Sequence, residues 1–160
     1  MKLTLVWWNT SLAPLSKTAA SESHLNTVCR VLECFVEQLQ ADFIALGEIN
    51  DDHFNYLEQY TNINGFRWLN LSGKNERITF DTCVLVREDK LQILYTQNLI
   101  LPKATNSVKI GQKLIMAVAD YDSPVHIFLS HWTNVRDCHE ADSDVATLNR
   151  TLFYKITEKT

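Results

Sequence analysis

ADFIALGEIN, residues 41–50, carries the clearest structural signal in the chain. Its centre, Phe43-Ile44-Ala45-Leu46, is a short uninterrupted apolar run, which is typical of a strand buried on both faces. The chain then turns acidic at Glu48. A carboxylate at the end of a buried strand must be solvated, paired or bound to a cation. The stretch therefore predicts a buried strand that ends in a carboxylate.

The segments on either side predict alternating helices and strands. Residues 3–8 are strand-like, and residues 21–40 have the apolar spacing of a helix capped by Ser21 or Ser23. A short second helix follows residue 50, with Asp51 or Asp52 as its cap. Strands are then expected at 66–72, 80–88, 91–101, 113–121 and 124–132, with a tight turn at 122–124 and a final helix at 140–159.

Composition indicates one globular domain. The chain has 160 residues, of which 46% are hydrophobic and 21% charged, and its formal net charge is −4. This mild acidity argues against a broad basic surface that would bind nucleic acid by charge alone. The element order favours a layered α/β or α+β sandwich over a Rossmann fold, and the sequence contains neither GxGxxG nor GKS/T.

Cysteine usage and hydropathy indicate the compartment. The four cysteines form no CxxC pair, so a zinc ribbon or a disulfide framework is not expected, and free thiols in a reducing compartment are. The apolar run from Leu3 to Trp8 is too short for a signal peptide, and no stretch approaches the roughly 18 apolar residues of a membrane span. We therefore expect a soluble, cytoplasmic protein.

Two strand ends carry oxygen-donating side chains. Asn9 follows the first strand and Glu48 ends the second. If these strands are neighbours in one sheet, the two side chains emerge together, and an amide oxygen with a carboxylate suits Mg²⁺ or Mn²⁺. The alternative is that Asn9 caps a turn and Glu48 is a solvated strand end.

A third polar strand end is Ser130-His131-Trp132-Thr133-Asn134. His131 could donate a hydrogen bond to a phosphoryl oxygen or transfer a proton, or it could be a satisfied structural histidine. Arg136 in the following loop could bind a substrate phosphate, or it could be a solvated loop residue. Trp7 and Trp8 must face opposite sides of their strand, so at least one is expected in the core and the other could stack on a base.

The order of LVWWN, a helix, DFIALGE, FDTCVLVRE and HIFLSHW resembles the deoxyribonuclease I-like endonuclease/exonuclease/phosphatase superfamily. The resemblance implies a four-layer αββα sandwich of which residues 1–160 form a single domain, supplying roughly its first half or more. It also implies that Asn9 and Glu48 lie at a site for Mg²⁺ or Mn²⁺. His131 would contact the scissile phosphate, with Asn134 and Arg136 as further substrate-binding residues.

The sequence also departs from the family pattern. Gly47 stands where the family usually has Gln, and Ser130-His131-Trp132 stands for Thr-His-Leu. The later G-D-x-N and S-D-H motifs, which would orient water and supply a general base, are absent. A half-sandwich would leave an apolar face or edge uncovered, so we expect a longer protein, a partner chain or a homodimer to complete it.

Two functional hypotheses follow from these observations. The first is a metal-dependent phosphodiesterase or nuclease-like hydrolase of phosphate esters, DNA and RNA among them, with catalytic residues His131, Glu48 and Asn9 and with further residues required beyond this chain. The alternative is a catalytically incomplete interaction or assembly module with the same fold.

Overall fold

The computed structural model describes residues 2–13, 20–71, 81–102 and 107–130. Two helices and seven strands lie within these ranges. In chain order they are β1 (Leu5–Asn9), α1 (Glu22–Glu37), β2 (Phe43–Ile49), α2 (Asp51–Tyr60), β3 (Phe66–Asn70), β4 (Asp81–Arg87), β5 (Leu91–Pro102), β6 (Ser107–Val118) and β7 (Tyr121–Leu129). The predicted helix at 140–159 lies outside the described residues.

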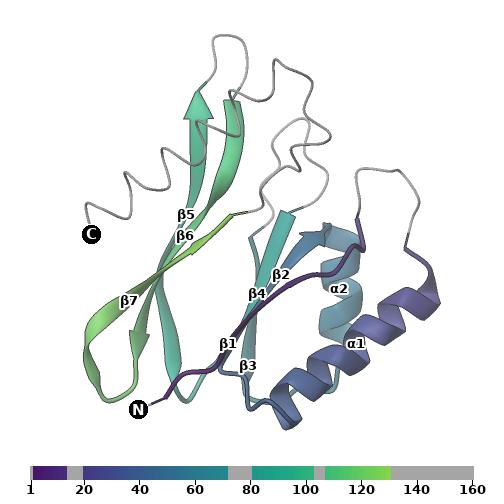
Figure 1. Ribbon diagram of the computed structural model, residues 1–160, viewed down its shortest axis with the longest axis horizontal. Coiled ribbons are helices and arrows are strands. Elements are labelled where there is room, and N and C mark those ends of the chain that lie inside the picture. The colour runs from purple at the N-terminus through teal and green to yellow at the C-terminus, as the bar shows by residue number, and fades with distance from the viewer. Residues whose placement is uncertain (1, 14–19, 72–80, 103–106, 131–160) are drawn as a thin grey trace.

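The strands form two sheets that pack face to face. The first has the order β1-β2-β4-β3, with β1 parallel to β2 and the other pairs antiparallel, and the second has the order β5-β6-β7. Helices α1 and α2 cover the outer face of the first sheet, and the second sheet covers its inner face (Figure 1). The described residues thus supply three layers, in the order helix, sheet, sheet.

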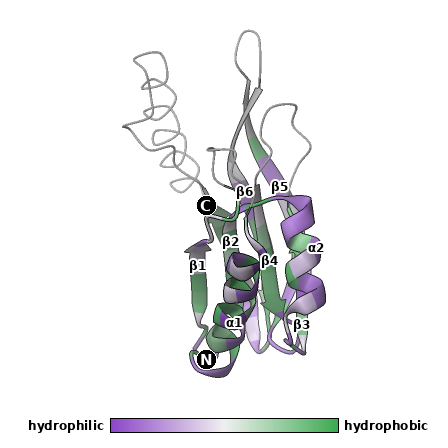
Figure 2. Ribbon diagram, turned by 90° about the vertical axis from the view of Figure 1, so that its right-hand side faces the viewer, coloured by the Kyte–Doolittle hydropathy of each residue, from purple (hydrophilic) through white to green (hydrophobic). Residues whose placement is uncertain are grey.

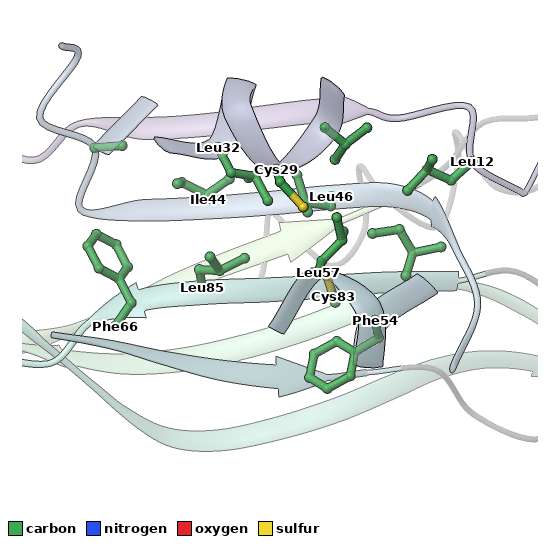
Figure 3. Close-up of a cluster of buried hydrophobic side chains, with 13 residues drawn as sticks. Leu12, Cys29, Leu32, Ile44, Leu46, Phe54, Leu57, Phe66, Cys83 and Leu85 are labelled. Carbon is green, nitrogen blue, oxygen red and sulfur yellow. The ribbon is translucent and has the colours of Figure 1, made fainter. Parts of the chain in front are cut away.

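Strand β2 lies at the centre of both hydrophobic cores. Every residue of β2 except Glu48 is buried. Ile44 and Leu46 point into the core beneath the helices (Figure 3), and Phe43 and Ala45 point into the core between the sheets. Figure 2 shows that each helix carries both hydrophobic and hydrophilic residues and that β2 and β4 behind them are largely hydrophobic. The uninterrupted apolar run at residues 43–46 predicted the burial of β2.

The helix caps confirm one prediction and correct another. Ser21 caps α1, and its side chain accepts a hydrogen bond from the His24 N–H at 3.2 Å. The cap of α2 is Asn50 rather than Asp51 or Asp52, and its Oδ1 accepts from the His53 N–H at 2.8 Å. Asn50 has the extended backbone that a cap requires, and the two aspartates occupy the first turn, where the helix dipole favours negative charge.

The turn between β6 and β7 also differs from the prediction. It lies at Ala119 and Asp120 rather than at 122–124, and Asp120 adopts a left-handed conformation with φ of 60°. The pairing of β6 with β7 shifts register between Met116 and Val118, opposite the segment that contains Pro124. A proline is tolerated there because β7 is an edge strand in the second sheet and the ladder is already interrupted.

Asp42 anchors the beginning of β2. It is 1% exposed, and its carboxylate contacts Lys90 Nζ at 2.7 Å and Arg87 Nε at 3.1 Å, both through Oδ1. Its Oδ2 accepts a hydrogen bond from the Thr4 N–H at 3.0 Å. Burial alone would raise the pKa of Asp42, but the bonds from Lys90 and Thr4, with the charges of Lys90 and Arg87, outweigh it and lower the pKa.

Two further expectations can be compared with the described part of the chain. Cys29, Cys34 and Cys83 are free thiols, and Cys138 lies outside the described residues. None of the helices described is long and apolar enough to cross a membrane.

Candidate functional site

The ends of β1 and β2 bring Asn9 and Glu48 together. In the parallel register Asn9 is the partner of Gly47, the residue before Glu48. The Asn9 Nδ2 group donates a hydrogen bond to Glu48 Oε1 at 2.9 Å, and the pair lies at the solvent-accessible rim of the first sheet. The two strands are therefore neighbours in one sheet, as predicted, and they run parallel.

A β-bulge presents Glu48 at this rim. Leu46 pairs with Cys83 and Ile49 pairs with Asp81, so Gly47 and Glu48 together oppose the single residue Thr82. The extra residue keeps Ile49 on the same buried side as Leu46 and leaves Glu48 partly exposed. Bulges commonly re-aim a side chain beside an active site.

The backbone of Glu48 is strained. Its φ is 58°, in the left-handed region that non-glycine residues rarely adopt. Such a conformation costs on the order of 1–3 kcal/mol and persists only where its surroundings hold it. Backbone strain of this kind clusters at active and binding sites, which makes Glu48 a candidate residue of such a site.

The loop after β1 holds the bulge in place. The buried Thr10 donates its hydroxyl to the Gly47 carbonyl at 2.9 Å, and its N–H donates to the same oxygen at 3.1 Å. The Ala13 N–H donates to the Glu48 carbonyl at 2.8 Å. Thr10 was not predicted from the sequence, because its only signal there is that it directly follows Asn9.

The amide of Asn9 orients the carboxylate. Its Oδ1 accepts from the Ser11 N–H at 3.0 Å while its Nδ2 donates to Glu48, and these two bonds fix which end of the amide faces the carboxylate. In this arrangement the Asn9 NH₂ group, rather than its oxygen, faces Glu48. Asn9 is thereby suited to positioning Glu48.

The donor chemistry of Glu48 fits a hard divalent cation. Mg²⁺ keeps several of its waters and is typically held by one or two carboxylates together with substrate phosphate oxygens. Within the described ranges no group of three or more His, Cys, Asp or Glu residues could hold a metal ion. As a single carboxylate, Glu48 fits such a cation, which would take its remaining ligands from water and substrate.

Trp7 lies against the backbone beside this pair. A Cβ added at Gly47 would lie 3.3 Å from Trp7 Cζ2 and 3.4 Å from Cη2, which is tighter than an ordinary contact. Gly47, which stands where the family usually has Gln, therefore leaves room for the Trp7 indole. Trp7 is 45% exposed, whereas Trp8 packs into the core edge-to-face against Phe35, so the two face opposite ways as predicted.

The predicted phosphate-contacting residues His131, Asn134 and Arg136 lie outside the described residues. The strand that leads to them ends near the candidate site. Leu129 of β7 pairs with Gln112 of β6, Gln112 accepts a hydrogen bond from the Thr82 hydroxyl, and Thr82 opposes the bulge. The carboxyl end of β7 therefore lies at the same end of the sandwich as Glu48.

No protein-family model matches the sequence, and no curated protein is significantly similar to it. Solved structures do match. D. rerio TDP2 complexed with a single-strand DNA product is 16% identical, with a TM-score of 0.68 over 99% of this chain and 56% of that one. The Bacteroides thetaiotaomicron mannosyl-6-phosphatase Bt3783 is 13% identical, with a TM-score of 0.69 over 99% of this chain and 59% of that one.

A third match carries the family name. The endonuclease/exonuclease/phosphatase family protein from B. thetaiotaomicron is 14% identical, with a TM-score of 0.60 over 79% of this chain and 49% of that one. The chain thus spans between 49% and 59% of the length of these three proteins. At such low identity the matches concern the fold, and they confirm the resemblance inferred from the motifs. The described residues have the fold of the endonuclease/exonuclease/phosphatase proteins, and of its four αββα layers they supply one helical layer and the two sheets.

Proposed function

We propose that this protein is a phosphate-ester hydrolase, or the metal-binding portion of one, in which Glu48 binds Mg²⁺ or Mn²⁺. The observation that carries the proposal is the hydrogen-bonded Asn9–Glu48 pair on a bulge at the rim of the sheet. The fold supports it, since the structures that share this fold include a mannosyl-6-phosphatase and a TDP2 bound to a DNA product.

Each residue has a role in this proposal. When bound, the divalent cation stabilises negative charge on the phosphoryl oxygens. Glu48 binds the cation, and Asn9 holds Oε1 of Glu48 in one orientation, so little reorganisation is needed when the substrate arrives. Thr10 fixes the Gly47 carbonyl and with it the bulge. His131 contacts the phosphate, and Asn134 and Arg136 bind the substrate.

The second candidate function is an interaction or assembly module with the same fold. It is favoured by β1, which is an edge strand of the first sheet and exposes two large apolar side chains, Leu5 at 51% and Trp7 at 45%. A partner chain, a second copy or a further segment of a longer protein would cover this strand and complete the sandwich. In that case metal-dependent hydrolysis is not required of this chain.

The test combines metal binding with turnover. Thermal unfolding is followed with and without Mg²⁺ or Mn²⁺, and hydrolysis of bis-p-nitrophenyl phosphate and of single-stranded DNA is assayed under the same conditions. A cation at about 100 times its Kd should stabilise the protein by about 2.7 kcal/mol. Glu48→Gln should abolish the stabilisation and the turnover, whereas Glu58→Gln, on the exposed surface of α2, should preserve both. Absence of both effects in the unmodified chain would contradict the proposal and favour the module.

A further inference from the structure

Residues 10–13, the segment that follows β1, bind the backbone of the Glu48 bulge. The Thr10 N–H and hydroxyl both donate to the Gly47 carbonyl, at 3.1 and 2.9 Å, and the Ala13 N–H donates to the Glu48 carbonyl at 2.8 Å. In a regular strand successive carbonyl groups point towards opposite edges, whereas here two in a row turn towards the same segment. The 10–13 segment therefore sets the direction of the chain at Glu48.

Two left-handed residues meet at this contact. In the part of the chain that the structure describes, the non-glycine residues with positive φ are Ser11, Gln40, Glu48 and Asp120. Gln40 follows the end of α1 and Asp120 lies in the turn between β6 and β7, and left-handed residues are common at both kinds of position. Ser11, with φ of 53°, and Glu48, with φ of 58°, belong instead to two segments that are hydrogen-bonded to each other. Because such strain persists only where the surroundings impose it, the two conformations depend on the same contacts.

Leu12 anchors the segment in the hydrophobic core. Its side chain is fully buried and lies in the core beneath the helices, which Leu46 also enters (Figure 3). Its N–H donates to the Thr10 hydroxyl at 3.3 Å, so that the hydroxyl accepts one bond while it donates the other to Gly47. Withdrawing the segment from Glu48 would expose the Leu12 side chain to water, which is unfavourable. Leu12 thus ties the backbone of Glu48 to the core.

The same segment orients the other member of the candidate pair. The Ser11 N–H donates to Asn9 Oδ1 at 3.0 Å, which leaves Asn9 Nδ2 to donate to Glu48 Oε1 at 2.9 Å. Residues 10–13 therefore contact both the backbone that carries Glu48 and the side chain that faces its carboxylate.

We propose that Thr10 and Leu12 are positioning residues for the cation site: through the 10–13 segment they hold Glu48 in the left-handed conformation in which its carboxylate meets Asn9. Neither residue has to touch the cation or the substrate. The proposal rests on the function proposed above, since it takes Glu48 as the ligand, and it adds that cation affinity is set from the hydrophobic core. Removing a group that orients a metal ligand typically weakens metal binding by roughly 10- to 100-fold.

The first test compares two leucines of equal burial. Leu12 and Leu32 are both fully buried in the same core, but only Leu12 belongs to the 10–13 segment. Leu12→Ala and Leu32→Ala should both lower the urea midpoint, because each leaves a cavity in that core. Only Leu12→Ala should also weaken the binding of Mn²⁺ to the folded chain, by about tenfold in calorimetric titrations without urea. Equal weakening in the two variants would mean that Leu12 acts through stability alone, and it would overturn the proposal.

A milder pair of variants covers the case in which Leu12→Ala does not fold. Thr10→Val removes the hydroxyl and keeps the shape of the side chain, whereas Thr10→Ser keeps the hydroxyl. We expect Thr10→Val to weaken Mn²⁺ binding about tenfold and Thr10→Ser to restore most of it. Thr61→Val, which changes a buried threonine at the C-terminal end of α2, is the matched control and should leave the affinity unchanged. Equal affinities in Thr10→Val and Thr10→Ser would overturn the proposal.

The conformation of Glu48 can be measured without any cation. A positive φ brings the amide and α protons of one residue close together, so Glu48 should give a strong nuclear Overhauser effect between these two protons in the unmodified chain. This signal should weaken in Leu12→Ala and Thr10→Val and stay strong in Leu32→Ala. A signal that stays strong in the first two variants shows that Glu48 keeps its conformation without the anchor, which overturns the proposal.

Failure of the proposed function gives a different result. If the unmodified chain binds no Mn²⁺, the proposed function is contradicted, and the amide–α signal of Glu48 alone then supports or overturns its positioning by residues 10–13. If the unmodified chain binds Mn²⁺ and the Leu12 and Thr10 variants bind it equally well, the proposed function stands and the positioning proposal is overturned.

Discussion

Asp42 and Glu48 stand at the two ends of β2 and differ in almost every physical respect. Asp42 is 1% exposed, lies within ion-pair distance of Lys90 and Arg87, and accepts a backbone hydrogen bond. Glu48 is partly exposed, sits on a bulge with φ of 58°, and is oriented by the neutral amide of Asn9. An acid enclosed by cations in relaxed backbone serves the fold. An acid on a strained backbone at the rim of the sheet is a candidate for a binding site.

The largest effect is expected from the buried acid. Asp42→Ala should lower the free energy of unfolding by about 3 kcal/mol, the lower end of the range for breaking a buried ion pair, because Lys90 and Arg87 are partly exposed and can turn towards water. The measurement is the urea midpoint at an unchanged m-value. Asp89→Ala, in the exposed turn beside it, is the matched control and should change stability by less than about 0.5 kcal/mol.

Lowering the pH should remove the contribution of Asp42 to the free energy of unfolding without a mutation. Because the folded-state pKa of Asp42 is lowered, its contribution to stability is present above the unfolded value of about 3.9 and is lost as pH falls through the lowered folded value. The pH dependence of the urea midpoint below pH 4 should therefore be steeper in the unmodified protein than in Asp42→Asn. Equal slopes in the two proteins would mean that other carboxylates dominate acid unfolding.

The contrast also shows what the sequence could predict. The burial of Phe43 to Leu46 follows from an uninterrupted apolar run, and the meeting of Asn9 with Glu48 follows from two strands that end in polar groups and run parallel. The first prediction rests on a residue pattern within one strand, and the second follows from the polar ends of two strands. The function of Asp42 as a buried anchor was not foreseen, since Lys90 and Arg87 reach it from more than 40 residues away.

The features that the sequence did not predict depend on contacts with neighbouring elements. The bulge arises only when Gly47 and Glu48 are set against Thr82, and no pattern within residues 41–50 encodes that register. Gln112 lay just outside the strand expected at 113–121, and its burial depends on Thr82 and Leu71 on the opposite sheet. The Asn50 cap was missed because aspartates followed it, and the end of β2 decides which residue begins the helix.

A smaller effect is expected at the glycine before the exposed acid. Gly47→Ala should cost about 1 kcal/mol, since its Cβ would crowd the Trp7 ring and the neighbouring side chain must shift. Trp7→Ala should remove most of that cost, so that a double-mutant cycle measured by urea unfolding gives a coupling of about 0.5 kcal/mol or more. Leu5→Ala, on the same face of β1, is the control background. Additivity in both backgrounds would show that Gly47 is not there to accommodate Trp7.

The smallest effect, and the one of opposite sign, is expected at Glu48 itself. Glu48→Gly should leave the protein as stable as before or raise its free energy of unfolding by up to about 1 kcal/mol, because glycine adopts a positive φ without the steric cost and the lost bond to Asn9 is near the surface. The same variant should lose any stabilisation by Mg²⁺ or Mn²⁺. Glu48→Ala keeps the strained backbone and removes the carboxylate, so it separates the effect of the strain from that of the carboxylate. This variant should lose the stabilisation by Mg²⁺ or Mn²⁺ without any rise in the free energy of unfolding. If Glu48→Gly instead destabilises the protein as much as Asp42→Ala does, then Glu48 also serves the fold, and the distinction between the two ends of β2 fails.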